Sequence, residues 1–112
     1  MSRALFIAVT LALASQAYAG DAAKGKQISE KGAGGPPCAS CHGLDGATPV
    51  APENPILAGQ HYDYIVRALM DYKSGKRSNG VMKVVVDQMK RQDMEDAAAW
   101  FSSQKSKLHF QR

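Results

Sequence analysis

The two cysteines of the chain stand three positions apart in the run Cys38-Ala39-Ser40-Cys41-His42, and this run constrains the fold more than any other part of the sequence. Side chains three positions apart lie on one face of a helical turn, so both sulfurs can reach the same object. His42 can present its imidazole from the same side. The 112 residues leave room for one compact domain. A domain this small buries little apolar surface and often needs a disulfide, a metal or a cofactor.

Three kinds of site use a Cys-x-x-Cys pair. A thioredoxin-like dithiol belongs on a strand-helix-strand scaffold, which this sequence does not indicate. A structural zinc site needs further cysteines or a closely spaced histidine pair, and the sequence has neither. With the histidine added, the run is the attachment sequence of c-type haem. Cys38 and Cys41 would form thioether bonds to the porphyrin, and His42 would be the proximal ligand. The sequence therefore predicts one covalently attached haem c.

The N-terminus has the pattern of a cleavable signal peptide. Arg3 gives a positive start, an apolar stretch runs from Ala4 to Ala14, and Ala17 and Ala19 are the small residues that a signal peptidase reads. The stretch is far shorter than the roughly 20 apolar residues of a spanning helix. We therefore expect cleavage before Gly20, export to the periplasm and a mature chain without a membrane span.

The charge of the chain limits its partners. Lys and Arg outnumber Asp and Glu by 14 to 10, a formal net charge of +4. Because no arginine-rich stripe is interleaved with aromatic residues, nucleic-acid binding is not expected. The small positive excess favours weak attraction to acidic protein surfaces. We divide the sequence into a signal peptide (1–19), one domain (20–104) and a basic C-terminal tail (105–112).

Apolar periodicity predicts helices in the domain, and almost no alternating strand pattern is present. Asp21 is a suitable N-cap for a first helix, and Gly75 is a suitable glycine to end a second. The expected helices are 22–31, about 61–74, and a last one that carries Met94, Ala97, Ala98 and Phe101 at helical spacing. The segments 43–59 and 75–80 are expected to be loops, and the second leads to Met82.

With these features in place, the chain resembles the single-domain class I cytochromes c of bacteria, nearest to the c4 and c553-like branch. The resemblance covers nearly all of the chain after the signal peptide. It rests on residues 38–42 and, more weakly, on segments 55–60, 73–77 and 98–104 and on Met82. It implies an all-α class I cytochrome c fold, with three to five helices wrapped around one covalently bound haem.

Several residues could bind the sixth position of the iron. The candidates after the signal peptide are Met70, Met82, Met89, Met94, His61 and His109. A methionine in a predicted helix is by default core filler, which applies to Met70 and Met94. The two histidines fall at a helix start and in the tail. The resemblance places the axial methionine at Met82, and Met89 is the next candidate.

Three further contacts are expected, and the resemblance implies the first and the last of them. The carbonyl of Pro55 would accept the second ring proton of His42, although a proline here can also be an ordinary turn residue. Asn79 would hydrogen-bond toward the ligand sulfur or a propionate, or serve as a turn residue. A small residue of the first helix packs on an aromatic of the last, which suggests Gly25 against Trp100.

The sequence departs from the family before the last helix. Members tend to place a capping Ser or Thr there, where this chain has Lys90. A lysine side chain cannot accept the capping hydrogen bonds. Asp93 can still favour the first turn through the helix dipole, so we expect the helix and leave its first residue open.

The resemblance implies an electron carrier and no enzymatic activity, because ligation by His42 and Met82 leaves no iron position open to a substrate. We expect a monomer or weak dimer that serves membrane respiratory complexes or periplasmic oxidoreductases. Four basic residues that bracket Met82 would steer acidic partners; they are Lys73, Lys76, Arg77 and Lys83. The alternatives are an electron-transfer subunit of a dehydrogenase or oxidase complex and, in third place, a haem peroxidase or gas sensor with a vacant iron position.

Overall fold

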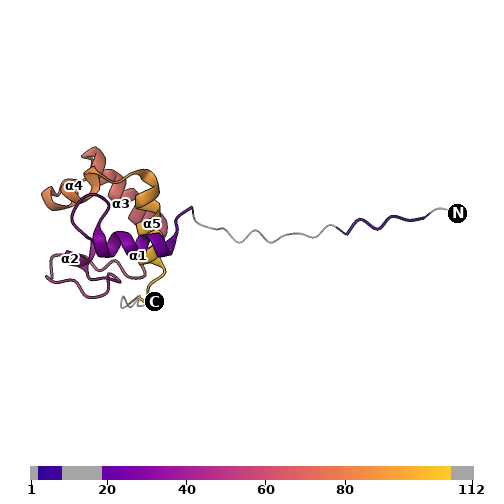
Figure 1. The fold of residues 1–112 in the computed structure, drawn as a ribbon, viewed down its shortest axis with the longest axis horizontal. Coiled ribbons are helices and arrows are strands. Elements are labelled where there is room, and N and C mark those ends of the chain that lie inside the picture. Colours follow the sequence, from indigo (N-terminus) through magenta and orange to yellow (C-terminus); the bar gives the residue numbers. More distant parts are fainter. Residues whose placement is uncertain (1–2, 9–18, 107–112) are drawn as a thin grey trace, which may run out of the picture.

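The computed structural model describes residues 3–8 and 19–106, and every regular element within them is a helix. The elements are α1 (Ala22–Lys31), α2 (Ala39–His42), α3 (Tyr62–Ser74), α4 (Gly80–Asp87) and α5 (Arg91–Ser102), as labelled in Figure 1. The predicted all-α class is confirmed. The predicted boundaries of the signal peptide (1–19) and the C-terminal tail (105–112) stay predictions, because residues 1–2, 9–18 and 107–112 lie outside the described residues. The ligand candidate His109 also lies outside them.

The first helix has the predicted bounds. Asp21 caps it, since its Oδ1 accepts hydrogen bonds from the backbone N–H of Ala23 at 2.9 Å and of Lys24 at 3.2 Å. The helix ends at Gly32, whose φ of +78° suits a residue without a Cβ. The local signals read from the sequence are thus the contacts that start and stop α1.

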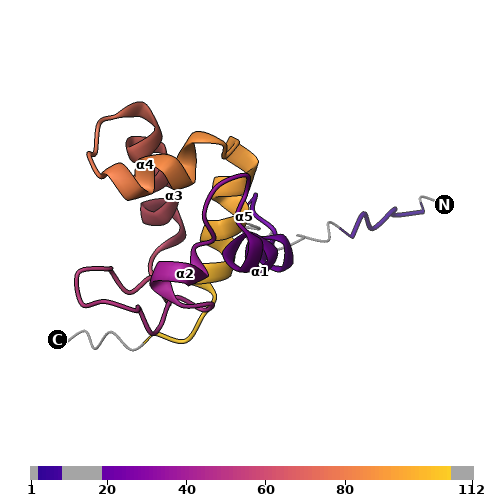
Figure 2. The same ribbon diagram turned by 60° about the vertical axis from the view of Figure 1, so that its left-hand side comes forward.

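Helices α1 and α5 cross at close range (Figure 2). A Cβ placed on Gly25 would overlap the carbonyl oxygen of Asp96 and lie 2.7 Å from the Cβ of Trp100. The predicted contact of Gly25 with Trp100 is therefore confirmed. The side chain of Asp96 is buried and accepts the backbone N–H of Asp21 at 2.8 Å, which ties the start of α1 to α5.

The last helix begins at Arg91 without a capping hydroxyl. Instead, the carboxylate of Asp93 reaches back and accepts the backbone N–H of Lys90 at 2.8 Å, which is half of a capping box. The four residues predicted to share its apolar face are buried. Asp93 therefore replaces the missing cap by a direct hydrogen bond as well as by its charge.

Helix α4 corrects the prediction that the chain reaches Met82 directly from a loop. Asn79 is its N-cap, since Oδ1 accepts the backbone N–H of Val81 and of Met82, each at 3.0 Å. Val85 and Val86 are the buried residues of this helix. The run of β-branched residues, which lowers helix propensity, hid this helix from the sequence pattern.

The helices form a body whose core lies between α3, α4 and α5. Helix α5 packs against both α1 and α3, and α4 packs against α3. Figure 2 shows α3 and α4 on one side of this body, and α2 with the loop that follows it on another. Among the described residues, no helix has the length and apolar character to cross a membrane.

We predict that Gly25→Ala lowers the free energy of unfolding by about 2 kcal/mol, because the added methyl group pushes α1 away from α5. Thermal or denaturant unfolding of the holoprotein measures this effect. Gly80→Ala is the matched control. A Cβ at Gly80 meets nothing within 4 Å and its φ is not positive, so stability should stay the same or rise by up to about 1 kcal/mol. Equal effects of the two changes would contradict the proposed role of the crossing.

Candidate functional site

A cavity of about 440 Å³ gathers most of the predicted site residues. Cys38, Cys41 and His42 line it from α2 and its N-cap, and Met82 lines it from α4. Most of the remaining wall is apolar and comes from α3, α4, α5 and the loop before α3; it includes Leu57, Ile65, Leu69, Val85, Ala97 and Phe101. The cavity is thus mainly apolar, and two thiols, an imidazole and a thioether are among its lining side chains.

The cysteine-histidine run forms the single helical turn that the sequence predicts. The backbone N–H of His42 donates to the carbonyl of Cys38 at 2.9 Å, which closes the turn. The imidazole is buried, and its Nδ1 lies 2.9 Å from the carbonyl oxygen of Pro55. A neutral ring that donates from Nδ1 keeps the lone pair of Nε2 for a metal. The contact therefore both orients the ring and selects the tautomer that can ligate iron.

Two carbonyl oxygens anchor the loop that carries Pro55. The carbonyl of Cys41 accepts the backbone N–H of Val50 at 3.0 Å and Nδ2 of Asn54 at 3.1 Å. The carbonyl of Leu44 accepts from two helices, which contribute Ser29 Oγ and Trp100 Nε1, each at 2.8 Å.

No sequence pattern singled out Ser29, which is completely buried. It lies one helical turn beyond Gly25, on the face of α1 that meets α5. The sequence did offer one signal for it: a polar residue four positions after Gly25, and therefore on the helix face that packs against α5. Its hydroxyl, with the indole of Trp100, holds the backbone two residues after His42.

The environment of the cysteines argues against a redox dithiol. Both thiols are free and partly buried. Burial raises the pKa of the Cys38 thiol to about 11, whereas the attacking cysteine of a dithiol oxidoreductase has a lowered pKa. A neutral buried thiol suits permanent attachment to an apolar group better than disulfide exchange.

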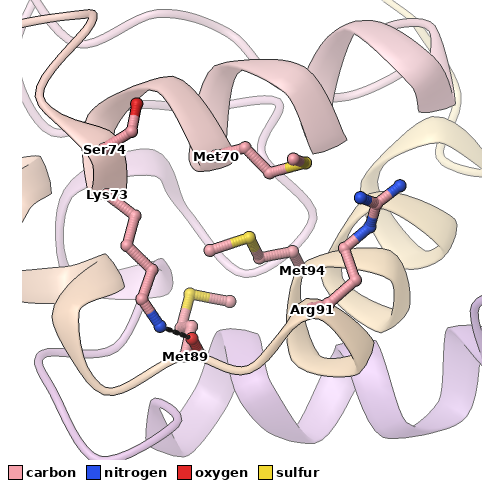
Figure 3. Close-up of a pocket in the computed structure, with 6 residues that line it drawn as sticks. All are labelled: Met70, Lys73, Ser74, Met89, Arg91 and Met94. Carbon is pink, nitrogen blue, oxygen red and sulfur yellow. Dashed lines mark hydrogen bonds between the residues drawn. The ribbon is translucent and has the colours of Figure 1, made fainter.

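The cavity narrows the choice of a second axial ligand to two methionines. Among the described candidates, Met82 and Met89 line it, and Met70, Met94 and His61 do not. Met89 is also part of the wall of a second, more open hollow of about 370 Å³ (Figure 3). There it lies with Met70 and Met94, so its side chain separates the cavity from the hollow.

Two of the four basic residues that bracket Met82 donate hydrogen bonds to main-chain carbonyls. The ammonium group of Lys73 donates to the carbonyl of Met89, and that of Lys83 donates to the carbonyl of Lys73 at 2.7 Å. Lys83 also pairs with Asp87 at 2.8 Å. The guanidinium of Arg77 lies 4.9 Å from the ring centroid of Tyr72, at the mouth of the cavity.

A helical domain in which a Cys-x-x-Cys-His turn and a methionine line one apolar slot is the arrangement of a c-type cytochrome. The family model described as cytochrome c matches residues 22–105. The chain belongs to the cytochrome c family, whose cofactor is covalently attached haem c, and it has the class I cytochrome c fold.

Individual relatives agree with this membership. Cytochrome c4 of Pseudomonas aeruginosa is 41% identical over 98 residues, which are 87% of this chain and 45% of that protein. A protein of Stutzerimonas stutzeri named thiosulfate dehydrogenase electron acceptor is 36% identical over 92 residues, 80% of this chain and 41% of its own length. The solved structure of cytochrome c4 from Acidithiobacillus ferrooxidans superposes with a TM-score of 0.67 at 36% identity, over 73% of this chain and 49% of that one. The chain thus spans about half the length of these relatives.

We predict that the double change Cys38→Ser and Cys41→Ser abolishes covalent haem attachment and leaves a largely unfolded chain, because the porphyrin supplies much of the core that a domain this small lacks. Expression in a host that matures c-type cytochromes, with haem staining of a denaturing gel and a circular-dichroism melt, tests both parts. Ser40→Ala, between the two cysteines, is the control and should keep the haem. A cooperative melt of the haem-free double variant would contradict the prediction.

Proposed function

We propose that this protein is a periplasmic carrier with one haem c, which passes single electrons between other redox proteins. The observation that carries the proposal is that His42 from α2 and Met82 from α4 line the same apolar cavity. Bound haem supplies an iron that alternates between the ferric and ferrous states. When the chain fills both axial positions, no site remains for a substrate, and no enzymatic activity is proposed.

Each predicted site residue receives a role. Cys38 and Cys41 hold the porphyrin by two thioether bonds, and Nε2 of His42 is the proximal ligand. The carbonyl of Pro55 keeps the ring of His42 in the ligating tautomer and fixes its orientation, a role supported by the 2.9 Å contact at Nδ1. The thioether of Met82 is the second ligand, and a soft neutral sulfur favours the ferrous state.

The choice of Met82 over Met89 is supported by their surroundings. Met82 is partly buried and lines only the cavity, and Asn79 fixes its backbone N–H. Met89 is 1% exposed, belongs to the core cluster and also faces the hollow of Figure 3. A side chain in that position packs as core and shields one wall of the cavity.

The sequence supports one haem and export to the periplasm, and the packing of residues near the N-terminus supports the proposed cleavage site. The printed sequence has one pair of cysteines, which provides thioether bonds for one haem. Gly20, the proposed first residue of the mature chain, packs closely on α5, where a Cβ would lie 3.0 Å from the Cβ of Ala99. By contrast, Leu5, Phe6 and Ile7 are between 78% and 93% exposed, as expected of a segment that is not part of the folded domain.

The partners are redox proteins. One relative bears the name of an electron acceptor of thiosulfate dehydrogenase, which supports a periplasmic oxidoreductase as the electron donor. Membrane respiratory complexes are the corresponding acceptors. The alternative of a permanent subunit of a dehydrogenase or oxidase complex is distinguished by purification, because a free carrier purifies without the enzyme.

We predict that Met82→Ala abolishes the methionine-to-iron charge-transfer band and lowers the reduction potential, because the iron loses its thioether ligand. Met89→Ala should keep the band and cost about 2–5 kcal/mol of stability as a core truncation. The ferrous wild-type protein should not bind carbon monoxide at neutral pH, and ferrous Met82→Ala should bind it. Loss of the band in Met89→Ala alone would reverse the ligand assignment, and carbon monoxide binding by the wild type would favour a peroxidase or gas sensor.

Of the four basic residues that bracket Met82, Lys76 and Arg77 do not donate to main-chain carbonyls among the described residues, and we propose that these two attract acidic partners. We predict that Lys76→Gln lowers the rate of oxidation by the anionic probe ferricyanide by roughly twofold at low ionic strength, since one attractive charge is lost. The difference should disappear near 1 M salt, where charges are screened beyond about 3 Å. A cationic cobalt(III) complex is the control oxidant and should react faster with the variant. The absence of any salt dependence would remove the steering role.

A further inference from the structure

The helix that carries Met82 depends on α3 for its position. In the described part of the chain, α3 is the helix against which α4 packs closely. Val85 and Val86 form the buried face of α4, whereas Val81 and Val84 are 62% and 57% exposed. Besides α3, this short helix packs on the loop that carries Gly35, where a Cβ would lie 3.0 Å from the carbonyl oxygen of Val84, so its packing comes from one helix and one loop. Its placement therefore depends on polar bonds in addition to packing.

Two such bonds meet in one residue, Lys73, in the last turn of α3. The carbonyl of Lys73 accepts the ammonium group of Lys83 at 2.7 Å. The ammonium group of Lys73 donates to the carbonyl of Met89, the bond drawn in Figure 3. Lys73 is thus an acceptor toward α4 and a donor toward the connection between α4 and α5.

The end of α3 makes both bonds favourable. Carbonyls in the last turn of a helix have no partner within the helix, and the helix dipole makes this end attractive to a cation. Lys83 satisfies the carbonyl of Lys73, and its second partner, Asp87, keeps it on the same side of α4. An isolated exposed ion pair would contribute little, but here the ammonium also closes a helix end.

We propose that Lys73 is a positioning residue for the axial methionine, holding α4 against α3 through its carbonyl and its ammonium group. The first bond reaches the residue directly after Met82, and the second reaches the segment just beyond α4. Together they limit how far the thioether of Met82 can withdraw from the cavity. The inference rests on the proposed assignment of Met82 as the second axial ligand.

Displacement of the methionine by added imidazole tests this inference in the ferric holoprotein. Imidazole binds iron only when the methionine leaves, so its dissociation constant reports how firmly α4 holds Met82. Lys73→Leu should bind imidazole at least about fivefold more tightly, as expected for loss of a charge-assisted hydrogen bond. Its reduction potential should also fall, because a loosened thioether stabilises ferrous iron less. Lys73→Arg, which keeps a cationic donor, should restore most of the wild-type affinity.

Two controls separate positioning from charge and from general stability. Lys76→Leu removes the same charge three residues away, where the ammonium group makes no hydrogen bond within the described residues, and should leave imidazole affinity unchanged. Ser29→Ala destabilises the histidine side of the cavity and should lower the melting temperature without a comparable gain in imidazole affinity.

The outcomes separate this inference from the ligand assignment. An unchanged affinity in Lys73→Leu, or equal gains in Lys73→Leu and in either control, would overturn the positioning role while Met82→Ala still lost the charge-transfer band. If Met82→Ala kept the band, the ligand assignment itself would fail, whatever the Lys73 variants did.

Discussion

The close crossing of α1 and α5 at Gly25 is the constraint on which the site depends. Because no side chain separates the helices there, Ser29 on α1 and Trp100 on α5 come near enough to donate to the same carbonyl, that of Leu44. That carbonyl stands two residues after His42, at the start of the loop that returns Pro55 to the imidazole. The packing of two helices is thus transmitted through one backbone oxygen to the orientation of His42, the proximal ligand in our proposal.

The two sides of the cavity are held in different ways. On the histidine side, main-chain carbonyls and donors from two helices and a long loop enclose the cysteine-histidine turn. On the methionine side, a short helix is held by the cap at Asn79, by two buried valines and by the lysine bonds at the end of α3. Lys73 and Lys83, whose side chains make the second set of bonds, are both exposed, whereas Ser29 and His42 are buried. In our proposal, the methionine side is therefore where the surface of the protein influences the iron.

The same lysine bonds reduce the number of basic residues around Met82 that are available to a partner protein. A count of charges around Met82 suggests four equivalent cations, but two of them, Lys73 and Lys83, donate to main-chain carbonyls. Arg77 lines the cavity together with Tyr64 and Val81, which are more than half exposed, and Lys76 precedes Arg77 in the chain. A small apolar surface next to two cations fits brief contacts with acidic redox proteins, which an electron carrier requires.

The sequence by itself determined whatever depends on neighbours along the chain. The attachment turn, the Asp21 cap of α1, the glycine that ends α3 and the apolar face of α5 could all be predicted, since each is a local pattern of a few residues. The resemblance added the pairing of Gly25 with Trp100 and the approach of Pro55 to His42. Helix α4 was missed because its valines favour strands and its cap at Asn79 also suits a turn. Only the tertiary structure decided that Ser29 holds the loop of His42, that two methionines and not four reach the cavity, and that the ammonium groups of Lys73 and Lys83 donate to main-chain carbonyls. These facts depend on which residues distant in sequence meet once the helices cross, and no pattern along the chain contains that information.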